Sequence, residues 1–302
     1  MDNAAFKLDL TATIRRGDCV RFRDSVSVNA VQVLPGSAEG IRDLAKVQYP
    51  PVGYCIYCGA TNDLSREHIV PFGLDGTAVL PEASCPGCAR ITGAIEGQVL
   101  RGPMRAVRVL RKLRSRSRHA GAPGTHRIRI YRNDAVVTVE IPLDEYPVLL
   151  HFPTFAAPRA LTGEGGSGIK LAGVASVLFG PSPEEVLRRL GGQRIVLDSP
   201  QYQPIAFARM LAKIGWAMAV AEGVQDRLDK PSQIVSSIRG EVDDIGQWVG
   251  TLTDPIRKYS GVLHRVSIHE DHEKEMLIAE VQLFADSETP SYGVILGRLR
   301  PN

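Results

Sequence analysis

Apolar side chains cover most faces of one predicted helix, residues 204–222. They include Ile205, Phe207, Met210, Leu211, Ile214, Trp216, Met218 and Val220. A helix that is hydrophobic on most sides is normally buried, so this segment predicts a core helix. Arg209 and Lys213 lie four residues apart and form its one narrow polar face, for which we expect capping contacts or solvent.

Alternating apolar and polar residues near the C-terminus predict a three-stranded meander at residues 262–269, 275–285 and 292–299. His264 shares a strand face with Val262, Val266 and Ile268. We therefore expect a hydrogen-bonded structural histidine there, because a polar ring among apolar neighbours needs a partner.

The middle of the chain mixes strand and helix signals. Strands are predicted at residues 126–131, 135–141, 146–153 and 194–198, the first two joined by an Asn133-Asp134 turn. A helix begins after Ser182, since a serine cap, Pro183 and two acidic residues follow one another. One or two further helices are predicted at residues 234–249.

The first 50 residues predict short strands at 5–14, 19–22 and 26–34, followed by a short helix at 38–46. These strands either form a small N-terminal subdomain or join the C-terminal sheet. Together these elements indicate an α+β fold.

The composition is that of an ordinary soluble protein, with 44% hydrophobic and 23% charged residues. No signal-peptide pattern opens the chain, and no run of about 18 apolar residues predicts a membrane span. Four of the five cysteines stand in pairs, which favours a reducing cytoplasm over a disulfide scaffold, and Cys19 is expected to be a passive thiol.

Two Cys-x-x-Cys pairs, Cys55/Cys58 and Cys85/Cys88, predict a structural zinc site. Each pair supplies two sulfurs from one tight turn, at about 2.3 Å from a tetrahedral Zn²⁺. Four thiolates leave no open coordination position, so this metal would stabilise the fold. Any chemistry would belong to the residues between the pairs.

Between the pairs stands Glu67-His68-Ile69-Val70-Pro71, and with it the segment resembles the HNH endonuclease family, whose ββα-metal fold often carries such a zinc site. The resemblance covers about 50 residues. It implies that Glu67 binds a catalytic Mg²⁺ or Mn²⁺ and that His68 accepts a proton from the attacking water. Independently, a histidine with a pKa of about 6.5 suits a general base at neutral pH.

The segment departs from the family where Ala89 follows Cys88, because many members have Asn or His there on the metal-binding helix. Glu96 lies near the same face of the predicted helix and is the candidate replacement ligand, with Thr92 a weaker one. Either the ligand has moved to Glu96 or the nuclease is degenerate. Hard oxygen ligands such as Glu67 and Glu96 favour Mg²⁺ or Mn²⁺.

A basic segment follows directly. Eleven of the 36 Lys and Arg residues, and none of the 33 acidic residues, lie between residues 101 and 132, although the whole chain carries only +3. Basic residues bind nucleic acid by displacing its condensed counterions. The alternative is the solvated face of an amphipathic helix. The candidate phosphate contacts are Arg101, Arg105, Arg108, Arg111, Lys112 and Arg114.

The sequence thus predicts a β-rich segment at residues 1–50, a zinc-stapled HNH-like module at 51–102, a basic helix and linker at 103–124, and a larger α+β domain at 125–302. We expect a metal-dependent endonuclease, acting on DNA, with structural zinc and catalytic Mg²⁺ or Mn²⁺. Two alternatives stay open. One is a zinc-dependent nucleic-acid-binding or regulatory module without catalysis, and the other is a defence effector that a partner or ligand activates through the C-terminal domain.

Overall fold

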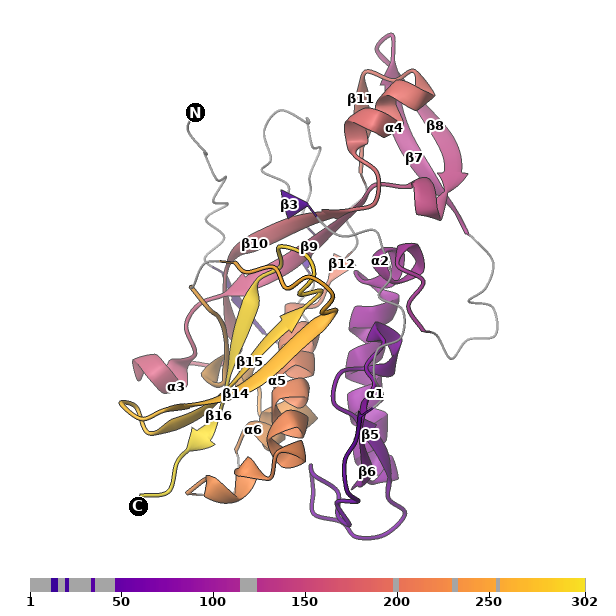
Figure 1. The fold of residues 1–302 in the computed structure, drawn as a ribbon. Helices are drawn as coiled ribbons and strands as arrows, with labels where there is room; N and C mark the ends of the chain where they lie inside the picture. Colours follow the sequence, from indigo (N-terminus) through magenta and orange to yellow (C-terminus); the bar gives the residue numbers. More distant parts are fainter. Residues whose placement is uncertain are drawn as a thin grey trace.

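The computed structural model describes residues 12–15, 20–21, 34–35, 47–114, 124–197, 201–229, 233–253 and 256–301 of the 302-residue chain. Over these residues the protein is mixed α and β, with six α-helices and several small sheets (Figure 1). The predicted helix at 38–46, Cys19, and the basic residues 116 and 118 lie outside the described residues.

Helix α5 (Pro204–Ala221) is the buried centre of the fold, as its sequence predicts. It lies between α1 (Pro86–Arg101) and the C-terminal sheet (Figure 1). Gly215 permits this close packing, because a Cβ at that position would lie 3.0 Å from the Cβ of Ala279. By length and composition α5 passes as a membrane span, but 83% of it is buried within the protein, as in the core helix of a globular protein.

The C-terminal sheet is antiparallel and confirms the predicted meander. Its strands run in the order β13-β16-β15-β14. They are β13 (Val249–Thr251), β14 (His264–Asp271), β15 (Met276–Leu283) and β16 (Ser291–Arg298). The short strand β13 was not predicted and adds an edge to β16.

A second sheet is built around β10 (Ile169–Phe179), the longest described strand and one that the sequence analysis missed. Its partners are β9 (Val148–Phe155) and β1 (Ala12–Ile14), both antiparallel, and β3 (Leu34–Pro35), which is parallel. Separately, β2 (Val20–Arg21) pairs with β12 (Gln201–Tyr202). The described N-terminal strands therefore join strands from later in the chain.

A third sheet, in the order β11-β7-β8, lies with α4 (Pro183–Leu190) at one end of the molecule (Figure 1). Its strands are β7 (Thr125–Arg132), β8 (Ala135–Pro142) and β11 (Arg194–Val196). Asn133 and Asp134 both have positive φ, 47° and 64°, which confirms the predicted tight turn. Ser182 accepts a hydrogen bond from the Glu185 amide at 3.1 Å, which confirms the helix cap.

The remaining helices are short: α2 (Arg105–Leu110), α3 (Arg159–Thr162) and α6 (Ile234–Arg239), with 3-10 turns at η1 (Phe72–Leu74), η2 (Leu143–Glu145), η3 (Val224–Arg227) and η4 (Ile245–Gln247). Arg209 donates to the Ile238 carbonyl at 2.9 Å, the capping contact expected for it. The buried apolar residues form one connected cluster that extends from Cys55 to Leu296.

His264 links the C-terminal sheet to the turn η1, and its structural role is as predicted. Its Nδ1 accepts from the Phe284 amide at 3.1 Å, so Nε2 carries the proton and donates to the Leu74 carbonyl at 2.7 Å. Burial lowers the pKa of His264 to about 4, against an ordinary value of 6.5.

This geometry predicts an acid-sensitive contribution to stability. Between pH 6.5 and 4 the unfolded chain binds a proton at His264 that the folded protein does not, so the free energy of unfolding falls as the pH falls, by up to about 3 kcal/mol. We expect His264→Gln to lose this contribution while other groups titrate unchanged. Urea unfolding from pH 7.5 to 4.5 measures it; parallel pH profiles for both proteins would contradict the assignment.

Candidate metal centre and adjoining groove

The candidate site is built on two antiparallel strands followed by a helix. Strand β5 (Ser65–His68) pairs with β6 (Ala78–Ser84), and α1 follows β6 directly. A two-residue strand, β4 (Val47–Gln48), lies parallel to β6. The connection between β5 and β6 needs Gly76, because a Cβ there would lie 1.9 Å from the Val70 carbonyl oxygen.

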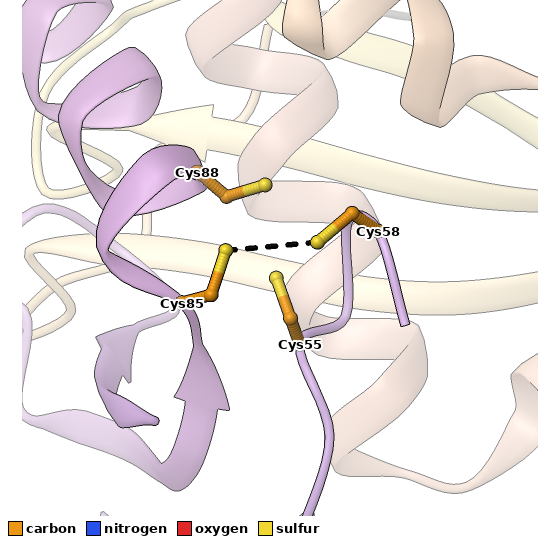
Figure 2. Close-up of side chains that lie close together, drawn as sticks. All are labelled: Cys55, Cys58, Cys85 and Cys88. Carbon is orange, nitrogen blue, oxygen red and sulfur yellow. Dashed lines mark hydrogen bonds between the residues drawn. The ribbon is translucent and has the colours of Figure 1, made fainter. Parts of the chain in front are cut away.

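The four paired cysteines converge into one cluster, which we call the four-cysteine cluster (Figure 2). Cys55 and Cys58 lie on a tight turn, and Cys85 caps the N-terminus of α1, with Cys88 in its first turn. All four Sγ atoms lie within 4.8 Å of one another, and those of Cys58 and Cys85 are 3.6 Å apart. Tetrahedral zinc at about 2.3 Å from each sulfur requires separations of roughly 3.8 Å, so the cluster can hold a metal ion such as zinc.

The thiols differ in acidity. Hydrogen bonding from the Cys88 backbone lowers the pKa of Cys85 to about 7, whereas burial raises the pKa values of Cys55 and Cys88. A metal ion must therefore displace protons from the two buried thiols. Binding of zinc here is coupled to proton release and becomes weaker as the pH falls.

Glu67 and His68 are neighbours on β5, so their side chains point to opposite faces of the hairpin. Glu67 is buried and faces α5, where the ammonium of Lys213 lies 2.7 Å from Glu67 Oε1 and 3.0 Å from Glu96 Oε1. The structure thus brings together the two carboxylates that the sequence assigns to a catalytic metal, but around a lysine.

The arrangement does not fit Mg²⁺ or Mn²⁺. Such ions need oxygen ligands at about 2.0 to 2.2 Å in near-octahedral geometry, and the space between the carboxylates is filled by the Lys213 nitrogen. Thr92, the weaker candidate, is buried and donates to the Cys88 carbonyl at 3.2 Å. Ala89 offers no ligand atom. We therefore assign no catalytic step to a metal held by Glu67 and Glu96.

His68 lies on the other face of β5, in a surface pocket of about 410 Å³ that we call the His68 groove. Arg66 and Arg114 also line it, and among the residues that the structure describes its lining includes no Asp or Glu. The His68 ring packs edge-on against Phe72 at 5.5 Å, and the Arg114 guanidinium lies over the same ring at 5.7 Å. Arg114 is held further by Asp75, which accepts from its backbone amide at 2.6 Å.

The structure separates the six predicted phosphate contacts into two groups. Arg101, Arg105 and Lys112 are exposed, and Arg114 lines the His68 groove. Arg108 is partly buried and donates to the carbonyls of Gly73 and Leu100, at 2.6 and 3.0 Å, so it joins the η1 turn to the end of α1.

Arg111 does not face solvent. It is buried, and its guanidinium donates two hydrogen bonds to Asp286, one of them at 2.9 Å from Nη1 to Oδ1. Because the Arg111 side chain is buried, a phosphate at the surface cannot reach its guanidinium. Arg111 therefore joins the basic helix to the connection between β15 and β16, contrary to the sequence-based expectation.

Sequence reasoning missed Lys213, Asp286 and Arg66 as members of these sites. A lysine within a mostly apolar, buried helix was the available signal, because a buried ammonium requires an acidic partner. Arg66 carried a signal too, since it stands two residues before His68 on the same strand face.

No protein-family model matches this chain, and no curated protein or solved structure matches it. A functional proposal for it therefore depends on the chemistry of the four-cysteine cluster, the Lys213 contacts and the His68 groove.

The four-cysteine cluster predicts about one zinc per chain. We expect Cys55→Ser and Cys88→Ser to lose the zinc and the cooperative folding of the hairpin and α1, because zinc-binding energy here is folding energy. Elemental analysis and thermal unfolding measure this, with Cys19→Ser as the matched control that keeps both. Zinc retained at full stoichiometry in the two variants would contradict the assignment.

The Arg111–Asp286 pair predicts a large stability effect at one basic residue and almost none at another. Arg111→Ala leaves a buried carboxylate unpaired and should lower the free energy of unfolding by about 3 to 5 kcal/mol. The matched control Arg105→Ala, at an exposed position, should change it by less than about 0.5 kcal/mol. Equal effects in denaturant unfolding would show that Arg111 is not buried as described.

Proposed function

We propose that this protein binds nucleic-acid phosphodiester backbone in the His68 groove and hydrolyses it with His68 as the general base, with DNA as the expected substrate. The observation that carries the proposal is that His68 lines a surface pocket together with Arg66 and Arg114. Two strands followed by a helix, with four cysteines clustered beside them, support an HNH-like module. Residues 55–101 are also the segment whose sequence resembles the HNH family.

The groove offers chemistry that suits a phosphate. Arginine donors contact phosphate oxygens in two-point geometry and stabilise the negative charge that develops as water attacks phosphorus. His68 accepts the proton of that water, the new P–O bond forms, and the electron pair of the breaking P–O bond leaves with the departing oxygen. The exposed Arg101, Arg105 and Lys112 add contacts to the flanking backbone.

A second candidate function is nucleic-acid binding without cleavage. It is favoured by the absence of acidic residues from the described lining of the groove and by the engagement of Glu67 and Glu96 with Lys213. Nucleases that hydrolyse DNA commonly use metal ions bound by carboxylates. A measurement of DNA cleavage therefore distinguishes the two functions.

The test is relaxation of supercoiled plasmid by the zinc-loaded protein, with Mg²⁺, with Mn²⁺ and without added divalent ions. Omitting the ions is preferable to EDTA, which would also remove structural zinc. We expect nicking that falls by about 10²- to 10⁴-fold in His68→Ala, since this variant removes the general base. Nicking at wild-type rate in His68→Ala would remove His68 from the mechanism.

Binding is measured in the same preparations. Arg66→Ala should weaken DNA affinity and reduce the slope of log K against log salt by about 0.9, because one phosphate contact is lost. The matched control is Lys274→Ala, at an exposed position in the turn between β14 and β15, and we expect no change of slope. Salt-sensitive binding without nicking in any metal condition would select the second function.

A further inference from the structure

The ammonium group of Lys213 lies in a buried cage of oxygen atoms. Its Nζ is 2.7 Å from Glu67 Oε1 and 3.0 Å from Glu96 Oε1, and it donates to the carbonyl of His68 and, at 3.4 Å, to that of Ile69. The Lys213 side chain is only 1% exposed, and those of Glu67 and Glu96 are 8% and 22% exposed. We call this group of four oxygens and one nitrogen the lysine cage.

The cage keeps the lysine charged. Burial alone lowers the pKa of Lys213, but the nearby charges of Glu67 and Glu96 more than offset this and leave the pKa above its ordinary value. Two carboxylates and one ammonium give the cage a net charge of −1. Without the lysine the net charge would be −2, so the cage would attract another cation.

We propose that the Lys213 ammonium is the resident cation of the Glu67–Glu96 pair, in the place that the sequence assigns to Mg²⁺ or Mn²⁺, and that it positions His68 through the His68 backbone carbonyl. The assignment of the cation depends on geometry alone. The positioning role rests on the proposed function, because it concerns the residue that would act as base in the His68 groove.

The surrounding contacts support a permanent place for the lysine. One turn further along α5, Trp216 Nε1 donates to the Ile56 carbonyl at 2.8 Å, so the same helix face contacts the four-cysteine turn. The lysine cage lies on the face of β5 opposite the His68 groove, and Lys213 therefore cannot contact a phosphate bound there. Its influence on His68 is structural: one contact fixes the backbone carbonyl of His68, a residue that lines the groove.

The first experiment uses the wild-type protein and needs no activity. Mn²⁺ titration of the zinc-loaded protein, followed by electron paramagnetic resonance, should reveal no Mn²⁺ bound by Glu67 and Glu96. The comparison is Glu67→Gln/Glu96→Gln, checked for folding by circular dichroism. If the wild type binds about one Mn²⁺ and the folded variant does not, the proposal is overturned. If both proteins bind the same Mn²⁺, that ion is held by other residues, which agrees with the proposal.

The second experiment removes the lysine. Lys213→Ala leaves two buried carboxylates without a cation, and we expect its melting temperature to fall by roughly 6 °C or more. Millimolar Mn²⁺ should restore most of that loss, because the emptied cage can take a divalent ion. Mn²⁺ should not raise the melting temperature of the wild type. It should also not raise that of the triple variant Lys213→Ala/Glu67→Gln/Glu96→Gln. A Lys213→Ala variant that melts like the wild type, or that Mn²⁺ does not stabilise, would overturn the proposal.

The positioning role has its own readout. In Lys213→Ala we expect plasmid nicking to fall at least tenfold with DNA affinity within twofold of wild type, and Mn²⁺ to restore the rate together with the melting temperature. Restored stability with an unrestored rate would reject positioning of His68. If the wild-type protein does not nick DNA at all, the nuclease proposal fails, while the two measurements above still decide the identity of the cation.

Discussion

The contacts of α5 with the hairpin and α1 are the constraint on which the rest of the structure depends. One face of this helix packs against the C-terminal sheet so closely that position 215 admits only glycine without displacing a neighbour. The opposite face carries Lys213 and Trp216 to the hairpin and to the four-cysteine turn. The four-cysteine segment and the C-terminal sheet therefore share one helix, and neither can move without changing the packing of the other.

Buried charge, more than apolar contact, specifies how these parts meet. Lys213 with its two glutamates and Arg111 with Asp286 each join segments that lie far apart in the sequence. Apolar surfaces tolerate sliding and repacking, whereas a buried ion pair has one acceptable register because any other leaves a charge unpaired. His264 adds a third polar link, from the sheet to the η1 turn. These contacts join the elements that carry His68 and Arg114 to the groove that both residues line.

Local signals were sufficient for much of the fold. The Asn133-Asp134 turn, the cap at Ser182 and the apolar pattern of α5 each depend on a few neighbouring residues, and each was interpreted correctly. The cysteine spacing likewise predicted that the four thiols converge into one cluster. Strand β10 was missed because small residues near its middle, from Gly173 to Ser176, interrupt the apolar alternation of its ends.

The nature of the site was harder to predict, because its decisive pairs are distant in the chain. Glu67 meets Lys213 across 146 residues, and Arg111 meets Asp286 across 175. A glutamate beside a histidine has the same local sequence whether it binds a metal ion or a lysine. An arginine on an amphipathic helix likewise does not show whether it faces a phosphate or a buried carboxylate. Only the three-dimensional arrangement distinguishes these cases.

The order of residues along the chain gives the lysine cage a consequence for synthesis on the ribosome. Both cysteine-bearing turns and all of α1 have been translated by residue 101, but the ammonium group that pairs with Glu67 and Glu96 arrives only with residue 213. Zinc can close the four-cysteine cluster early, yet the two carboxylates remain without their partner until α5 has emerged. Domains generally fold as they are translated, from the N-terminus onward. Here the two carboxylates of the site gain a cationic partner only from a helix more than 100 residues later, so the four-cysteine segment and the C-terminal half complete their folding together.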